Sequence, residues 1–247
     1  MKDTNCILLK HMNKSFGRHQ VLKDINMEVP SGAIYGMLGP SGCGKTTAVK
    51  IIAGISEATS GEVMVLNEKM PKLNLMEQIG YMAQSDALYG DLTARENLDF
   101  FGQLYGIQKS TLAVRIEEAA KVVNLHKELN KPVSTFSGGM KRRLSLAMTI
   151  LHEPKVLILD EPTVGIDPLL RRSIWEELYK MTERGVTILV TTHVMDEAEK
   201  CTHLSMMRDG KMIAAGTPNE IQKQAGVQTI EEAFLYFSSI EEEGVSL

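Results

Sequence analysis

The N-terminal part of the chain carries short apolar runs in which hydrophobic and polar residues partly alternate. The runs cover residues 7–12, 25–29 and 62–66. Turn-forming residues bound them at 13–17, 30–32 and 60–61. Partial alternation between turns is typical of strands with one buried face. The pattern therefore predicts an antiparallel sheet in this part of the chain.

From about residue 88 to residue 151, the apolar positions follow a helical period instead. One predicted helix carries four apolar residues on a single face: Leu112, Ile116, Ala119 and Val123. Their spacing of i, i+4, i+7 and i+11 is that of an amphipathic helix. Residues 93–96 have the sequence of a capping box, which predicts the start of another helix. Ser137 and two glycines precede a third helical run.

Continuous apolar runs at residues 156–159 and 186–190 predict buried strands. A strand covered on both faces of a parallel sheet has no need to alternate. A helix is predicted between the two runs, because Ile174, Leu178 and Met181 fall on one face. Residues 79–82 predict a further short strand. Strands that alternate with helices indicate α/β packing with right-handed crossovers.

A glycine-rich segment lies between a predicted strand at 33–38 and a predicted helix at 48–53, and it matches the P-loop pattern. Its members are Gly39, Pro40, Ser41, Gly42, Cys43, Gly44, Lys45, Thr46 and Thr47. In such a loop, backbone N–H groups and a helix N-terminus surround the phosphates of a nucleotide. We expect Lys45 to reach the β- and γ-phosphates and the Thr46 hydroxyl to bind Mg²⁺.

Polar residues follow the predicted buried strands at the ends where ligands bind in open α/β sheets. Asp160 is therefore expected to hold Mg²⁺, directly or through water. Glu161 is expected to activate or orient an attacking water molecule as a general base. His193 follows the next parallel strand, where contact with a γ-phosphate is expected. Asp167 precedes a proline, which is the pattern of a helix N-cap.

Size, composition and charge narrow the class of protein. The 247 residues are 43% hydrophobic and 23% charged, which suits one large domain or two small ones. The formal net charge of −4 disfavours broad nucleic-acid binding. Three separated cysteines and the absence of a secretory or membrane-spanning run predict a soluble, cytoplasmic protein.

Together, these motifs resemble those of the ATP-binding subunit of ABC transporters, and the resemblance extends from about residue 7 to residue 221. Residues 39–47 match the Walker A loop, and residues 156–161 match Walker B with its catalytic glutamate. Further motifs match at Gln84 (Q-loop), Ser137, Gly138, Gly139 and Met140 (signature), residues 165–167 (D-loop) and His193 (switch histidine). Phe16 takes the place of the aromatic residue that stacks on adenine, and Val21 lies beside it.

The resemblance implies a P-loop NTPase (RecA-like) α/β core with a parallel sheet, an antiparallel β subdomain and an inserted α-helical subdomain. It implies one ABC ATPase domain over residues 1–247. Residues 1–87 and 152–225 would form the catalytic core with the antiparallel β subdomain, 88–151 the helical signature subdomain, and 226–247 a C-terminal tail.

The resemblance also implies ATP and Mg²⁺ as cofactors, with catalytic roles for Lys45, Gln84, Glu161 and His193. Nucleotide contacts would come from Phe16, Val21, residues 39–47, Gln84, residues 137–140, Asp167 and His193. Mg²⁺ would be held by Thr46, Gln84 and Asp160.

The partners implied are a second ATP-binding subunit and an integral membrane permease. Two subunits, in a homodimer or a heterodimer, would close head to tail around two ATP molecules. The P-loop of one subunit would then face Ser137–Gly139 of the other. The chain would be peripheral on the inner face of the cell membrane. Residues 92–98 and 165–171 look most like those of bacterial ABC-2 type exporters, which handle drugs, antibiotics, peptides or polysaccharides.

Two positions depart from the family pattern, and two other functions stay open. Met140 stands where Gln is commonest, and Phe16 stands where Tyr is usual, so stacking is kept but a hydroxyl is lost. A soluble ABC-type ATPase acting on nucleic acid or ribosomes is one alternative, although sustained heptads are absent and the chain has one ATPase half. A P-loop kinase is another, which the signature and the Glu161–His193 pair disfavour. No nucleic-acid partner is expected.

Overall fold

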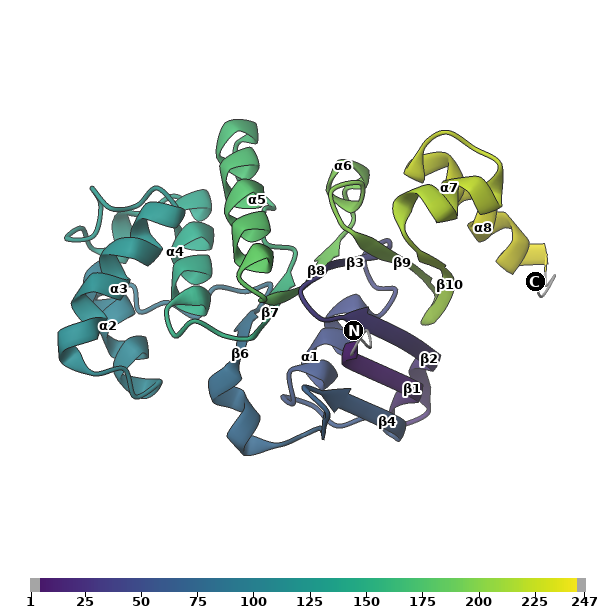
Figure 1. The fold of residues 1–247 in the computed structure, drawn as a ribbon, viewed down its shortest axis with the longest axis horizontal. Coiled ribbons are helices and arrows are strands. Elements are labelled where there is room, and N and C mark those ends of the chain that lie inside the picture. The colour runs from purple at the N-terminus through teal and green to yellow at the C-terminus, as the bar shows by residue number, and fades with distance from the viewer. Residues whose placement is uncertain (1–4, 244–247) are drawn as a thin grey trace. The chain divides into compact units, whose positions relative to one another are not determined.

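The computed structural model describes residues 5–243, so predictions for the terminal residues 1–4 and 244–247 lie outside it (Figure 1). The chain forms two compact units. Unit 1 comprises the residues up to Leu73 together with those from Thr187 onwards, and unit 2 comprises Asn74–Val186. Each unit is described by itself.

An antiparallel sheet in unit 1 has the order β2-β1-β4-β5. Its strands are β1 (Asn5–Phe16), β2 (His19–Pro30), β4 (Ser60–Val65) and β5 (Glu68–Lys69). The sheet confirms the predicted antiparallel strands. The predicted turn at residues 13–17 was wrong for 13–16, because β1 continues to Phe16, which pairs with His19, whereas Gly17 does lie in a turn. Register shifts accommodate this polar stretch, and the Asn13 side chain accepts hydrogen bonds from Gln20 Nε2 and the Asp24 backbone.

A second set of strands in unit 1 surrounds β3 (Ile34–Leu38), every residue of which is buried. β3 pairs in parallel with β8 (Thr187–Thr192) on one side and β9 (His203–Arg208) on the other. β10 (Lys211–Gly216) pairs antiparallel with β9. Burial on both faces explains why β3 and β8 do not alternate between apolar and polar residues. The helix α1 (Lys45–Ile52) follows β3 through the glycine-rich loop.

The C-terminal helices of unit 1 belong to a hydrophobic core. They are α6 (Met195–Ala198), α7 (Pro218–Ala225) and α8 (Ile230–Glu243), and α7 and α8 lie together near the C-terminus (Figure 1). Ile221, Ala233 and Phe237 pack with Leu204 and Met206 of β9. Glu241 pairs with Lys211 of β10 at 2.5 Å.

Unit 2 combines a pair of parallel strands with a group of helices. The strands are β6 (Ile79–Met82) and β7 (Val156–Asp160). The α-helices are α2 (Ala94–Leu104), α3 (Lys109–Val122), α4 (Gly138–Ile150) and α5 (Pro168–Glu183). Two short 3₁₀ helices, η1 (Leu73–Gln78) and η2 (Val133–Thr135), precede β6 and α4. α2, α3 and α4 pack together, which confirms the predicted helical region (Figure 1).

Local sequence signals explain where these helices begin. Thr93 and Glu96 form the predicted capping box at the start of α2. The predicted apolar face of α3 is buried, with Leu112 and Ile116 almost fully covered. The mixture of parallel and antiparallel sheets with helices confirms the predicted α/β class. β6, β7 and α5 belong to unit 2 together with α2–α4, and the predicted subdomain boundaries stay a prediction.

Within residues 5–243, no helix combines the length and the apolar character needed to span a membrane.

The turn between β9 and β10 should be intolerant of a side chain at Gly210. Its N–H donates to Cys43 O at 3.2 Å, its carbonyl accepts from Lys23 N at 2.8 Å, and its φ is +80°. A Cβ there would lie 2.2 Å from Val21 O. We expect Gly210→Ala to lower the free energy of unfolding by about 2–4 kcal/mol, from left-handed strain plus overpacking. The measurement is the midpoint of urea denaturation.

Gly226→Ala is the matched control for this prediction. Gly226 also has a positive φ, +69°, but a Cβ there would meet no atom within 4 Å. It should therefore lose only the conformational part, about 1 kcal/mol. Equal losses in the two variants would contradict the close approach of Gly210 to β2.

Candidate functional site

The glycine-rich loop of unit 1 joins the end of β3 to the start of α1. Gly44 is the N-cap of α1 and has a left-handed φ of +108°. A Cβ on Gly44 would lie 2.7 Å from Leu22 Cδ2, so a larger residue would clash with β2. The loop is thus held tightly against β2 where it leads into α1.

Lys45 lies under this loop and is only 5% exposed. Its Nζ donates to Gly39 O at 2.7 Å and to Pro40 O at 3.0 Å. A buried ammonium group is costly unless hydrogen-bonded acceptors surround it. The two carbonyl groups hold the positive charge at the loop, where an anionic ligand would neutralise it.

His193 lies at the same sheet edge as the glycine-rich loop. β8 ends at Thr192, which is the register partner of Leu38 in β3, and Gly39 N donates to Thr192 O at 3.3 Å. The Thr192 hydroxyl donates to Glu197 Oε2 at 2.7 Å and so fixes the turn. The His193 side chain is exposed. Unit 1 therefore brings Lys45, Thr46 and His193 to one edge.

Phe16 and Val21 flank the turn between β1 and β2 in the same unit. The Phe16 ring is exposed, and Lys14 Nζ lies 4.9 Å from its centroid. Val21 O would be 3.3 Å from a Cβ on Gly44, which places Val21 against the start of α1. An open aromatic face beside a loop of this kind can stack on a planar ring.

The carboxylates of the proposed site lie in unit 2, after β7. Asp160, its last residue, is fully buried, and Glu161 follows with a φ of +53°. β6 runs parallel to β7, with Met82 opposite Leu159, so Gln84 follows β6 at the same edge as Asp160. Unit 2 therefore brings Gln84, Asp160 and Glu161 together.

Arg142 is a contributor to this edge that sequence reasoning missed. Its guanidinium donates to the backbone carbonyls of Ala83, Gln84, Asp160 and Glu161. Burial lowers the pKa of Arg142, and the nearby carboxylate of Asp86 acts in the opposite direction. A pattern of side chains cannot predict contacts with main-chain atoms. The signal that was available is an arginine on an otherwise buried helix face.

The segment Ser137–Met140 forms the start of α4 in unit 2. Ser137 is the N-cap, and its hydroxyl accepts from Met140 N at 3.3 Å. A Cβ on Gly139 would lie 3.0 Å from Gly165 O, so this helix start packs against the loop before α5. Asp167 caps α5 by accepting from Leu170 N at 3.1 Å, as its sequence predicted. Ser137 and Gly138 are exposed at the N-terminus of a 13-residue helix.

Comparison with known proteins supports the resemblance given by the motifs. A family model described as ABC transporter matches residues 22–164, more than half of the chain. The chain belongs to the ABC transporter family. It is 39% identical over 233 residues to the probable multidrug ABC transporter ATP-binding protein YbhF of Escherichia coli, covering 92% of this chain and 40% of that protein. The chain thus spans less than half of this relative.

Other ABC transporter proteins match over most of their own length. The Nod factor export ATP-binding protein I of Cupriavidus metallidurans is 36% identical over 232 residues, covering 92% of this chain and 77% of that protein. A bacterial ABC transporter cassette solved as a dimer superposes with a TM-score of 0.80 at 27% identity, covering 85% of this chain and 98% of the cassette. The same cassette has also been solved as a dimer in a post-hydrolysis state bound to ADP and phosphate.

The unit 1 loop fits the triphosphate that an ABC ATP-binding protein takes. It offers a buried lysine and the N-terminus of an eight-residue helix. Thr46, half-buried at the start of that helix, could bind Mg²⁺ together with nucleotide oxygens, the usual arrangement for this ion. In the part of the chain that the structure describes, no three His, Cys, Asp or Glu side chains gather as a metal site of their own.

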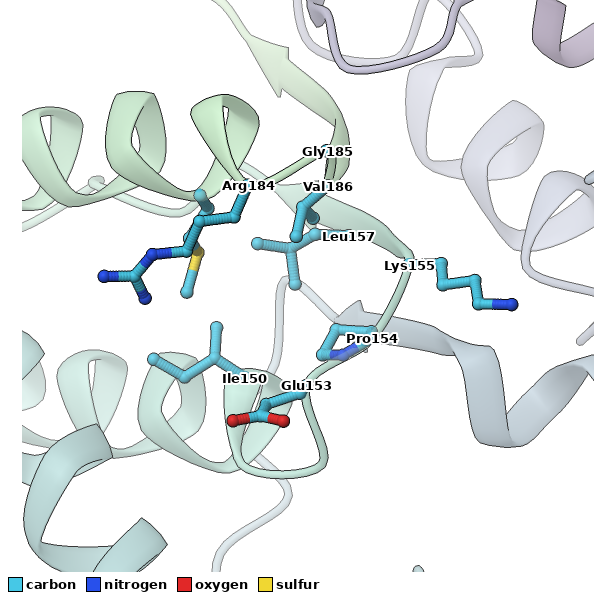
Figure 2. Close-up of a pocket in the computed structure, with 9 residues that line it drawn as sticks. Ile150, Glu153, Pro154, Lys155, Leu157, Arg184, Gly185 and Val186 are labelled. Atoms are coloured by element: carbon cyan, nitrogen blue, oxygen red, sulfur yellow. The ribbon is translucent and has the colours of Figure 1, made fainter.

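Unit 2 also contains a cavity of about 380 Å³, whose lining does not include Asp160 or Glu161 (Figure 2). Lys155 directly precedes β7 and Leu157 is its second residue, whereas Asp160 ends the strand. Ile150, Leu157 and Val186 line the cavity beside Arg184, and the Lys155 side chain extends away from it (Figure 2). This cavity therefore lies at the opposite end of β7 from Asp160.

The exposed ring of Phe16 should contribute to ATP affinity through stacking. We expect Phe16→Ala to raise the Kd for ATP about 5- to 100-fold, because base–aromatic stacking contributes roughly 1–3 kcal/mol. Phe16 is 57% exposed, so folding should be unaffected. Equilibrium titration with a fluorescent ATP analogue measures the change. Phe16→Tyr is the control and should retain wild-type affinity; ATP binding to Phe16→Ala with unchanged Kd would rule out the stacking role.

Proposed function

We propose that this chain is the ATP-binding and ATP-hydrolysing subunit of an ABC exporter and powers transport through a separate membrane subunit. The observation that carries the proposal is the buried Lys45, held by Gly39 O and Pro40 O beneath a loop that opens onto the N-terminus of α1. This arrangement concentrates positive charge where a triphosphate would sit. The names of its relatives support the same function.

The proposed roles follow from the chemistry of each side chain. Lys45 would bind the β- and γ-phosphates. Thr46, Gln84 and Asp160 would hold Mg²⁺, which would supply positive charge to neutralise the phosphates. Glu161 accepts a proton from, or orients, the attacking water, and His193 contacts the γ-phosphate. Phe16 and Val21 contact the adenine.

A second ATP-binding subunit would complete the site. The exposed Ser137 and Gly138 present the N-terminus of α4, a group of backbone donors suited to a phosphate. In the head-to-tail arrangement, these donors contact the γ-phosphate bound to the other copy and exclude water from it. ATP then favours the closed dimer because it contacts both subunits, and hydrolysis removes this preference. The dimeric state of the related bacterial cassette supports this proposal.

An aromatic surface on unit 2 supports a membrane partner. Tyr89, Phe100 and Leu104, at and before α2, are between 40% and 67% exposed, and the Tyr89 and Phe100 rings meet edge to face at 5.2 Å. Exposed apolar groups gathered in this way often mark an interaction surface. We place the chain at the inner face of the cell membrane, where it exports a drug, antibiotic, peptide or polysaccharide. The transporter names of the relatives favour this function over an ATPase acting on nucleic acid or ribosomes.

Glu161→Gln should retain ATP binding but slow hydrolysis by about 100- to 10,000-fold, the usual contribution of a general base. Phosphate release with saturating Mg²⁺ and ATP measures the rate, and EDTA should abolish it. Glu153→Gln is the matched control, since Glu153 is also in unit 2 and has a similar φ of +51°, but it pairs with Arg115. Turnover near wild type in Glu161→Gln would reject the assignment of Glu161.

Glu161→Gln should also form a dimer with ATP, because the nucleotide is held without being hydrolysed. Light scattering should report twice the monomer mass with ATP and the monomer mass with ADP. Adding Gly138→Asp should abolish the dimer without unfolding the chain, because a Cβ at this position meets no atom within 4 Å. The new negative charge would oppose phosphate. A protein that stays monomeric with saturating ATP would count against the head-to-tail dimer.

A further inference from the structure

Arg142 is a buried arginine whose contacts are mostly with the main chain. Arg142 lies in the second turn of α4 and is only 6% exposed. Nη1 donates to Ala83 O at 2.6 Å and Gln84 O at 3.1 Å. Nη2 donates to Glu161 O at 2.8 Å and also to Asp160 O. One guanidinium therefore joins two segments that lie far apart in the sequence.

These two segments leave the same edge of the sheet. Gln84 follows β6, and Glu161 follows β7, its parallel neighbour. The planar guanidinium presents its donors in a rigid fork, so each nitrogen serves one segment and the distance between the segments is fixed. A lysine has a single donor atom at its tip and could not hold both in this way.

The contacts with Asp160 and Glu161 have a specific consequence for the Glu161 backbone. Glu161 has a φ of +53°, in the left-handed region that residues with a Cβ adopt only at a cost. The two carbonyls that Nη2 binds lie on either side of the Glu161 Cα. Holding both opposes relaxation of this residue to a negative φ, which would redirect its side chain.

Asp86 completes the surroundings of the guanidinium. Its Oδ1 lies 3.7 Å from Arg142 Nη1 and accepts a hydrogen bond from Ser145 Oγ at 2.8 Å. Four carbonyl dipoles and one nearby carboxylate offset the desolvation of the charge. Because Asp86 follows Gln84 closely, the same arginine holds this segment through both its backbone and a side chain.

We propose that Arg142 is a positioning residue for ATP hydrolysis: it holds Glu161 in its left-handed conformation and ties that placement to the Gln84 segment. The proposal rests on the function proposed above, since it concerns the rate of the step assigned to Glu161. Arg142 itself touches neither nucleotide nor water in this role. It acts through the main chain of the residues that do.

The test is a double-mutant cycle on the full chain, with ATP hydrolysis and ATP binding measured separately. The variants are R142Q, E161Q and the double variant R142Q/E161Q, with R115Q as control. Arg115 is also a unit 2 arginine with a carboxylate partner, and its side chain is 24% exposed, but it lies on α3 and pairs with Glu153. Thermal unfolding shows that each variant is folded at the assay temperature.

We expect R142Q to lower kcat about 10- to 100-fold, the effect of a small misplacement of a catalytic group. The KM and Kd for ATP should stay within about threefold of wild type, because the interaction lost is one made in the transition state. In the E161Q background, R142Q should lower the residual rate by less than about twofold, since the two residues act as one unit. R115Q should leave kcat within about twofold of wild type.

A purely structural role predicts a different pattern. R142Q would then reduce the melting temperature but leave kcat per folded molecule near wild type, or it would lower the rate equally in both backgrounds; either result overturns the proposal. R142K serves as a second variant if R142Q does not fold, and full activity in R142K would also overturn it. If E161Q is as fast as wild type, the proposed function fails; if E161Q is slow and R142Q is not, only this inference fails.

Discussion

Each unit of this protein buries a cation against main-chain carbonyl groups at the end of its parallel strands. In unit 1, the cation is Lys45, held by Gly39 O and Pro40 O. In unit 2, it is Arg142, held by carbonyls that follow β6 and β7. Removing a charge from water costs several kcal/mol, and only well-placed acceptors offset this cost. The loops at both edges must therefore keep the shapes that supply those acceptors.

This constraint connects the fold to the proposed chemistry. A loop shaped around a buried lysine can turn some of its backbone N–H groups towards a bound phosphate. A strand end shaped around a buried arginine can hold Glu161 at a positive φ that an isolated chain would leave. Phe16, Ser137, Gly138 and His193 are exposed, whereas Lys45 and Asp160, which would also meet the nucleotide or its metal, are buried. Catalytic precision of this kind depends on the buried layer.

Helix starts have two uses in the same molecule. Ser137 caps α4, and Asp167 caps α5, so both residues stabilise the chain before any ligand is present. The start of α4 also approaches the loop before α5, because Gly139 lies against Gly165 O. A phosphate at the N-terminus of α4 would use backbone donors that a cap leaves unsatisfied. The structural and functional readings of these residues are thus compatible.

Sequence reasoning succeeded where the signal is local. The glycine-rich loop, the Thr93 capping box, the Asp167–Pro168 helix start and the apolar face of α3 each depend on neighbouring residues, and the structure contains all four. Sequence reasoning failed where the secondary structure depends on pairing or packing with distant segments. The polar residues 13–16 look like a turn, but they extend β1 because β2 supplies hydrogen-bond partners. The β9–β10 hairpin and the packing of α8 likewise depend on a core formed by distant segments.

The family, the nucleotide and the candidate residues were thus determined by the sequence itself, because phosphate chemistry requires particular side chains at fixed spacing. The contacts of Arg142 were decided only by the tertiary structure. Its acceptors are backbone carbonyls 59 positions before it and 18 positions after it in the chain. Carbonyl groups belong to every residue, so no sequence pattern can identify which of them a buried arginine will meet.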